Sequence, residues 1–254
     1  MPTTPPSASR CTTNSTNKAS APYLTPLPDD ATDYVSGMAY TYVKGAVLFK
    51  HMRYLLLLLG LIMSFTMKSQ TSYIFLAPGF EEIEALATVD AMRRAGMKVV
   101  EVAVADTKSV TGATAQTVVA DSLLADIDPA DAEWIIIPGG QPGADNLHAS
   151  PVVNKIIKKQ AERGGKVAAI CAGPAVVVAP TGILKGKKAT CYPGLGKMIE
   201  SNGGTYVKEP VVIGGNVITS EGPGTTLKFA KAIIRASLGQ QKADEILSSM
   251  LADD

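Results

Sequence analysis

The sequence predicts a doubly wound α/β domain, in which a mostly parallel sheet is sandwiched by helices. From residue 72 onward, short apolar runs of strand length alternate with longer segments of helical periodicity. Strands that alternate with helices at this spacing pair in parallel through right-handed crossovers. The apolar run 134–137 is too short for a helix and is typical of a central strand buried on both faces.

The order of the elements follows from apolar runs and from the glycines and prolines that end them. The predicted strands are residues 73–77, 98–105, 116–120, 134–137, 166–170, 187–191, 205–207, 211–213 and 216–219. The predicted helices are residues 80–95, 144–147, 151–163, 175–179, 194–201, 225–238 and 241–251. Local signals support several helices: Glu81 and Glu84 are acids in a first turn, Pro151 takes a first helical position, and Gly96 and Gly239 follow last turns. The last two β segments read as a hairpin that turns at Gly214 and Gly215.

Composition excludes several classes of protein. The formal net charge of the 254 residues is +1 and no dense basic run occurs, which argues against nucleic acid as the main partner. The three cysteines, Cys11, Cys171 and Cys191, form no C-x-x-C pair and no even set, so a disulfide framework and a structural zinc site are not expected. A reducing compartment, and hence the cytoplasm, is the expected location.

Residues 1–67 differ in composition from the rest. Threonine, serine, proline and asparagine dominate the first 50 residues, so we expect a disordered extension ahead of a folded domain at 71–253. A leucine-rich run at 54–62 is shorter than the roughly 18 apolar residues that span a bilayer. It is open to two interpretations: residues 54–67 act as an internal signal or anchor, or translation starts at Met67 and the preceding residues are a mis-assigned start.

The carboxyl ends of the predicted strands carry the candidate site, because ligands of doubly wound sheets gather there. Cys171 follows the strand 166–170 and opens a helical stretch, where main-chain N–H groups can lower the pKa of a thiol toward roughly 3.5–7.5. Gly139 and Gly140 follow another central strand and could present N–H groups to an oxyanion. Glu84 lies at a third strand end and could share a proton with the sulfur. The alternative is a small buried cysteine, a tight turn and an ordinary helix-start acid.

The sequence offers few histidines that could act as a general base. The chain has only His51, in the extension, and His148, which we expect at the surface. Cys191 is expected to be a buried strand cysteine, with a role as a resolving thiol as the alternative.

Four motifs resemble the DJ-1/ThiJ/PfpI superfamily, specifically its DJ-1 and YajL-like branch, over residues 71–253. They are LAPGFEEIEA around Glu84, IPGGQPGA around Gly139, AAICAGP around Cys171 and SEGPGT at 220–225. The resemblance implies a flavodoxin-like fold with a cysteine nucleophile elbow, a homodimer and no cofactor or metal. It further implies that Cys171 is prone to oxidation and hydrogen-bonded to a protonated Glu84.

The resemblance also assigns the surroundings of the sulfur. It places the N–H groups of Gly139, Gly140 and Ala172 at the oxyanion position, and Tyr192, Gly222 and Pro223 at the pocket rim. The protease-like branch has histidine where this chain has Ala172, so we do not expect a peptidase. The glyoxalase-active members have histidine where this chain has Tyr192, and a tyrosine with a pKa near 10 is a poor base at neutral pH.

Two functions are compatible with these residues. The first is an enzyme of the glyoxalase III or deglycase type, which acts on a small aldehyde or a glycated substrate through Cys171. The alternative is an oxidative-stress sensor or redox-regulated chaperone whose cysteine oxidises to a sulfinate without turnover. A catalytically silent relative is a third reading, which the tyrosine at 192 leaves open.

Overall fold

The computed structural model describes Met52 and residues 70–252. The chain divides into two units, Met1–Met67 and Lys68–Asp254. Apart from Met52, the predictions for residues 1–67, including the apolar run and the alternative start, therefore lie outside the described residues. In the described part of the chain, no helix is both long enough and apolar enough to cross a membrane.

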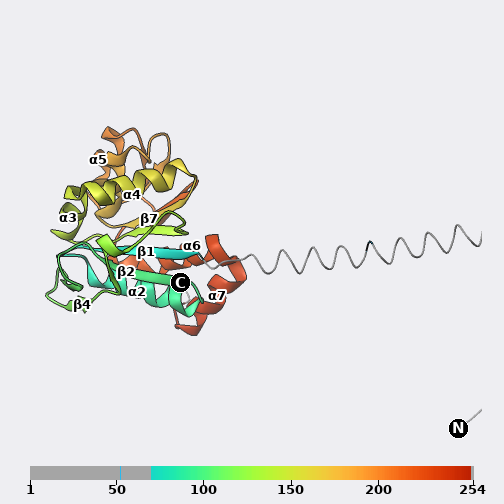
Figure 1. Ribbon diagram of the computed structural model, residues 1–254. Helices are drawn as coiled ribbons and strands as arrows, with labels where there is room; N and C mark the ends of the chain where they lie inside the picture. Colours follow the sequence, from blue (N-terminus) through green and yellow to red (C-terminus); the bar gives the residue numbers. More distant parts are fainter. Residues whose placement is uncertain (1–51, 53–69, 253–254) are drawn as a thin grey trace, which may run out of the picture. The chain divides into compact units, whose positions relative to one another are not determined.

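A seven-stranded sheet forms the centre of the domain, in the order β10-β11-β7-β6-β1-β2-β5 (Figure 1). All neighbours pair in parallel except β10 and β11, which are antiparallel. The strands are β1 (Thr71–Leu76), β2 (Lys98–Ala103), β5 (Ser122–Leu123), β6 (Trp134–Ile137), β7 (Lys166–Ile170), β10 (Val211–Gly214) and β11 (Val217–Ser220). The chain adds strands to both sides of β1, which confirms the doubly wound α/β architecture.

Helices cover both faces of the sheet (Figure 1). One layer contains α2 (Glu82–Arg94), α6 (Thr226–Leu238) and α7 (Gln240–Ser249), which pack on one another. The other contains α3 (Gly143–Ala149), α4 (Pro151–Glu162), α5 (Gly196–Ser201) and the short helix η2 (Gly173–Val178). In α2, Ala85, Val89 and Met92 recur at helical spacing and are buried, so the amphipathic pattern decides which face of the helix meets the core.

Three predicted strands exist but lie outside the main sheet, and one of them, predicted at 205–207, is β9 (Thr205–Tyr206). The segment predicted at 116–120 is β4 (Thr117–Val119), which pairs with the unpredicted β3 (Ser109–Thr111) as an antiparallel ribbon. The segment predicted at 187–191 is β8 (Lys188–Ala189), which pairs only with β9 (Thr205–Tyr206). Both β4 and β8 are short and partly exposed. A central strand of a parallel sheet is buried on both faces, so these segments do not have the burial of a central strand.

Two local predictions need correction. The helix predicted at 175–179 is the π-helical turn η2, followed by the 3₁₀ turn η3 (Ala179–Thr181). Pro174 and Pro180 lack the N–H group that an α-helical hydrogen bond needs, and three consecutive β-branched valines lie between them. Both features disfavour a regular α-helix. The hairpin turns at Gly215 and Asn216 rather than at Gly214, because Gly214 still pairs with Val217.

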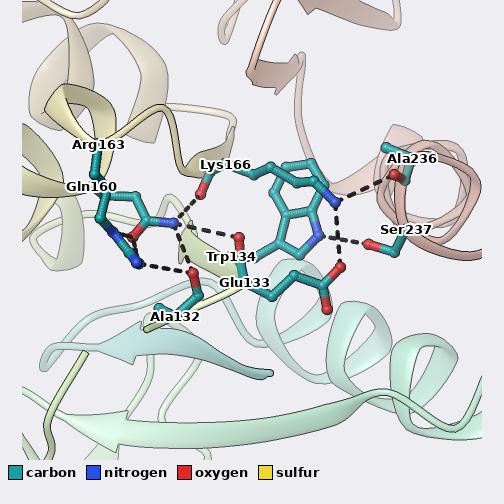
Figure 2. Close-up of polar contacts among 8 residues, drawn as sticks. All are labelled: Ala132, Glu133, Trp134, Gln160, Arg163, Lys166, Ala236 and Ser237. Carbon is teal, nitrogen blue, oxygen red and sulfur yellow. Dashed lines mark hydrogen bonds and ion pairs between the residues drawn. The ribbon is translucent and has the colours of Figure 1, made fainter. Parts of the chain in front are cut away.

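A polar cluster fixes the amino ends of β6 and β7, opposite the candidate site (Figure 2). The buried Gln160 side chain of α4 donates hydrogen bonds to three carbonyl oxygens, those of Ala132 (3.2 Å), Glu133 (3.3 Å) and Lys166 (3.0 Å). Lys166 also lies over the ring of Trp134, with its Nζ 5.3 Å from the ring centroid. The helix layer is thus tied to the strand starts by side chains, while the strand ends remain available for a site.

Candidate active site

Cys171 lies directly after β7 in a backbone conformation that side chains rarely adopt. Its φ is 63°, in the left-handed region, which costs on the order of 1–3 kcal/mol for a residue other than glycine. Two hydrogen bonds hold this turn: the Cys171 N–H donates to the carbonyl oxygen of Ser220 (2.9 Å), and the Tyr192 N–H donates to the carbonyl oxygen of Cys171 (2.8 Å). The neighbouring strand and the loop after β8 therefore fix the direction of the thiol.

The sulfur is nearly buried, and the side chain of Cys171 is 8% exposed. The N–H groups of Ala172 and Gly140 hydrogen-bond to it and lower its pKa. Burial, followed by the charge and hydrogen bond of Glu84, has the larger effect and raises the pKa of Cys171 to about 12. The main-chain N–H groups predicted to lower this pKa are thus present, but burial and the neighbouring carboxylate oppose them.

Glu84 reaches the sulfur from the first turn of α2. Its side chain is fully buried, and its Oε2 accepts a hydrogen bond from the Gly139 N–H at 2.8 Å. Its Oε1 has no hydrogen-bond partner. Burial raises the pKa of Glu84 to about 7, although the hydrogen bonds from Cys171 and Gly139 oppose this rise. Since each ionised group raises the pKa of the other, the pair holds one proton near neutral pH.

The two glycines after β6 have different tasks. The N–H of Gly139 is taken by Glu84, so it does not face the oxyanion position predicted for it, whereas that of Gly140 faces the sulfur. A Cβ at Gly139 would lie 2.7 Å from the Cβ of Cys171 and 2.9 Å from both its Sγ and the Oε2 of Glu84. Only glycine leaves room for the Cys171–Glu84 pair. Gly140 adopts a φ of 91°, and a Cβ there would lie 2.4 Å from the backbone N of Glu81.

A pocket of about 610 Å³ opens over the sulfur. Its lining consists of Glu81, Ala113, Gly140, Gln141, Cys171, Ala172, Tyr192, Pro193, Gly194, Leu195 and Pro223. Tyr192 is 49% exposed, so its ring stands at the mouth of the pocket. Gly222 does not line the pocket but lies behind that ring, where an added Cβ would be 3.4 Å from the ring carbon Cδ2. Of the predicted rim residues, Tyr192 and Pro223 thus face the pocket directly.

Two further acids, Glu81 and Glu82, precede Glu84 in the sequence, and the structure gives each a specific contact. The Oε2 of Glu81 accepts a hydrogen bond from the Glu84 N–H at 2.7 Å, so Glu81 caps α2. The buried Glu82 points to the β3–β4 ribbon, where its Oε1 accepts from the N–H and the hydroxyl of Thr114, each at 2.8 Å. The ribbon carries Ala113, whose N–H donates to the carbonyl oxygen of Phe80 at 2.8 Å, and it thereby forms one wall of the pocket.

The remaining candidates lie apart from the pocket. Cys191 is fully buried beside Tyr192, and burial together with the charge of Glu221 raises its pKa to about 12. His148 is exposed on α3 and does not line the pocket. Among the described residues, no group of three or more His, Cys, Asp or Glu side chains is placed to hold a metal ion.

These features define an α/β protein with a cysteine at a nucleophile elbow. The DJ-1/PfpI family matches residues 70–236 of the chain. The chain therefore belongs to the DJ-1/PfpI family.

Relatives agree with this assignment. Protein DJ-1 homolog B of Arabidopsis thaliana is 38% identical over 176 residues, which is 69% of this chain and 40% of the relative. The match to homolog A of the same plant covers 47% of that relative. The chain thus spans less than half the length of these two plant proteins. The glutathione-independent glyoxalase DJR-1.2 of Caenorhabditis elegans is 37% identical over 186 residues, which is 72% of this chain and 98% of the relative.

Solved structures show the same fold. Oxidized Toxoplasma gondii DJ-1 superposes with a TM-score of 0.69 at 32% identity, and covers 73% of this chain and 100% of its own. Drosophila melanogaster DJ-1beta gives a TM-score of 0.69 at 34% identity with the same coverage. The flavodoxin-like fold expected from the sequence is therefore confirmed.

Proposed function

We propose that this protein converts reactive carbonyl compounds through Cys171, as a cofactor-independent enzyme of the glyoxalase III or deglycase type. The observation that carries the proposal is the contact between the buried Glu84 carboxyl group and the sulfur of Cys171, which lines a pocket of about 610 Å³. We place the one proton of this pair on Glu84 and the negative charge on the sulfur. Two N–H groups face the sulfur, whereas the carboxyl group receives one and leaves its Oε1 without a partner. Ionising Glu84 instead would leave a buried charge poorly satisfied.

With methylglyoxal, the sulfur attacks the aldehyde carbon and a C–S bond forms. The electron pair of the C=O bond moves to oxygen, which takes the proton of Glu84 and gives a hemithioacetal. Glu84 is now a carboxylate and removes the proton from the former aldehyde carbon. It returns this proton to the neighbouring carbon, and the hydroxyl proton passes from the oxygen of the first carbon to that of the second. The second carbon is thereby reduced to an alcohol as the first is oxidised to a thioester. Water then cleaves the C–S bond, so the sum is methylglyoxal plus water giving lactate and a proton.

Tyr192 holds the position where glyoxalase-active relatives of this branch have histidine. Its half-exposed ring at the pocket mouth suits a hydroxyl that donates a hydrogen bond to the second carbonyl oxygen of the substrate. Glu84, whose pKa is raised to about 7, is the better group for the proton transfers, because a base works best near its own pKa. Ala172 contributes its N–H to the sulfur but has no side chain that could act as a base, so we propose no peptidase activity.

The test is lactate release from methylglyoxal by purified protein. Cys171→Ala is expected to abolish release, whereas Cys191→Ala, the matched control at a buried cysteine outside the pocket, is expected to retain it. Equal lactate release by the wild type and Cys171→Ala would remove the proposal.

A second function uses the same sulfur as an oxidative-stress sensor or as the switch of a redox-regulated chaperone. The Toxoplasma relative is described as oxidized, and here a neutral Glu84 could donate a hydrogen bond to a sulfinate on Cys171. The thiolate attacks one peroxide to give a sulfenate and water, and a second peroxide oxidises the sulfenate to a sulfinate and releases another water. Mild peroxide is expected to add two oxygen atoms to the Cys171 peptide before any other cysteine, as measured by mass spectrometry. Unselective oxidation would contradict this function.

We further propose that the protein is a homodimer, as its resemblance to this branch implies. Ile83 and Leu86 on α2 and Leu251 after α7 are exposed apolar side chains, with exposed fractions of 56%, 36% and 94%. A second copy of the chain could cover them. Sedimentation of the wild type and of Ile83→Lys measures the oligomeric state, and a monomeric wild type would contradict the dimer.

A further inference from the structure

We propose that the pocket selects carbonyl substrates by charge, and that the carboxylate of Glu81 makes it accept neutral dicarbonyls while rejecting α-oxo acids and other anionic aldehydes. The choice of substrate refines the proposed carbonyl-converting activity and rests on it. The electrostatic selection itself concerns any molecule that reaches Cys171.

Glu81 is held at the pocket wall by contacts on both sides. Its side chain is pinned by the 2.7 Å hydrogen bond from the Glu84 N–H. Its own N–H donates to the carbonyl oxygen of Gly139 at 3.1 Å. Gly139 is followed by Gly140, whose N–H faces the sulfur. The carboxylate is therefore not a mobile surface charge but a fixed charge in the wall of the pocket that Cys171 also lines.

No opposite charge compensates Glu81 within the pocket as this structure describes it. The lining residues include no lysine, arginine or histidine. Glu84 responds to the negative charge of Glu81, which raises the pKa of its carboxyl group. Glu221, two residues before the lining residue Pro223, adds negative charge that reaches Cys191, next to Tyr192. The start of α2 offsets part of the charge of Glu81, because helix N-termini carry about half a positive charge.

An anion that enters to reach the sulfur shares the pocket with this carboxylate. At a partly exposed site, a unit charge several ångströms away changes the binding of an anion by about three- to tenfold relative to a neutral molecule of the same shape. Methylglyoxal and glyoxal have no charge and escape the penalty. Glyoxylate carries a carboxylate next to its aldehyde and would suffer it.

Alkylation of Cys171 by a matched pair of reagents tests the inference without any turnover. Iodoacetate is an anion and iodoacetamide is its neutral analogue; in both reactions the sulfur forms a C–S bond as iodide leaves. The rate of each is followed by mass spectrometry of the Cys171 peptide, and the ratio of the two rates is compared among variants. The ratio cancels any change in the thiolate fraction, because both reagents react with the same thiolate.

Glu81→Gln keeps an oxygen that can accept from the Glu84 N–H but removes the charge. It is expected to raise the iodoacetate-to-iodoacetamide ratio about three- to tenfold. Glu81→Asp, which keeps the charge, and Glu162→Gln, which removes an exposed charge at the far end of α4, are expected to leave the ratio low. Added salt should raise the ratio of the wild type and leave that of Glu81→Gln nearly constant. An equal ratio in the wild type and Glu81→Gln would overturn the inference.

The substrate claim is checked by kcat/KM for methylglyoxal and glyoxylate in the same variants. Glu81→Gln is expected to improve glyoxylate relative to methylglyoxal by a similar factor. If neither aldehyde is turned over, the proposed function fails, while the alkylation ratio still decides whether Glu81 excludes anions.

Discussion

Glu84→Gln separates two states of the Cys171–Glu84 pair. Glutamine has the shape of a protonated glutamic acid, retains an acceptor for the Gly139 N–H and can never carry a charge. If Glu84 is neutral in the wild type, the substitution exchanges a strong O–H donor to the sulfur for a weaker N–H donor. If Glu84 is ionised, the substitution removes a negative charge next to the sulfur. The two cases shift the pKa of Cys171 in opposite directions.

The size of each shift follows from the geometry. A hydrogen bond to a charged group contributes about 1.5–3 kcal/mol, so its partial loss would raise the pKa of the sulfur by about 1–2 units. For the charge, an added Cβ at Gly139 would lie 2.9 Å from both Sγ and Oε2, so these two atoms are less than twice that distance apart. A unit charge at roughly 4–6 Å with an effective dielectric constant near 20 contributes about 3–4 kcal/mol, so its removal would lower the pKa by about 2–3 units.

The assay is the rate of iodoacetamide alkylation of the Cys171 peptide as a function of pH, in the wild type and in Glu84→Gln. Our proposal places the proton on Glu84, so we expect a midpoint about 1–2 units higher in the variant. Glu162→Gln serves as the control and should follow the wild type, because Glu162 is exposed at the opposite end of the sheet. A midpoint lowered by about 2–3 units would refute the reasoning. Identical profiles would show that the two side chains do not interact.

Two further predictions concern the supports of the site. Burial would raise the pKa of Glu82, but the hydrogen bonds from Thr114 and Gln116 outweigh this effect and lower the pKa. The ionised Glu82 therefore stabilises the fold above the pKa that it has in the unfolded chain, and this contribution is lost as pH falls through the pKa of the folded protein. Glu82→Gln should therefore cost about 1–2 kcal/mol in urea unfolding at pH 7, with the deficit shrinking in acid, and a pH-independent deficit would contradict this. Gln160→Ala should cost about 1–3 kcal/mol in urea unfolding, because the carbonyl oxygens of Glu133 and Lys166 lose their bond from this amide, while that of Ala132 keeps its bond from Arg163. Cys171 alkylation should stay at the wild-type rate, and a parallel loss of alkylation would show that the two ends of the sheet are coupled.

The sequence was sufficient for six strands of the main sheet and for the position of Cys171, because both depend on local patterns, but it did not predict the two-residue edge strand β5. The run at 134–137 is buried throughout, as four consecutive apolar residues indicate. The strand before Cys171 pairs with β6 and β11, so the carboxyl ends of three strands meet around the sulfur. Convergence of this kind follows from parallel pairing alone.

The contacts between distant segments could not be predicted in the same way. The segment at 116–120 had a strand pattern, but nothing local indicates that its partner is β3 or that Glu82 holds the ribbon. A signal was present in Gly112, where a Cβ would lie 2.4 Å from the Oε1 of Glu82, but its meaning requires the fold. The sequence likewise placed the Gly139 N–H at the right strand end and could not show that Glu84 accepts it.

The three acids at the start of α2 show why residue type alone does not assign a role. Successive helical residues are rotated by about 100°, so neighbours in sequence face different surroundings. Glu84 faces the sulfur and is fully buried, so its pKa rises; Glu82 faces the ribbon, where N–H and hydroxyl donors lower its pKa. Glu81 precedes the helix and stays partly exposed, so it remains a charge at the pocket wall. An exchange of Ile83 with Glu84 would preserve the composition of the segment and destroy the proton-sharing pair, because only the side chain at position 84 meets both the sulfur and the Gly139 N–H.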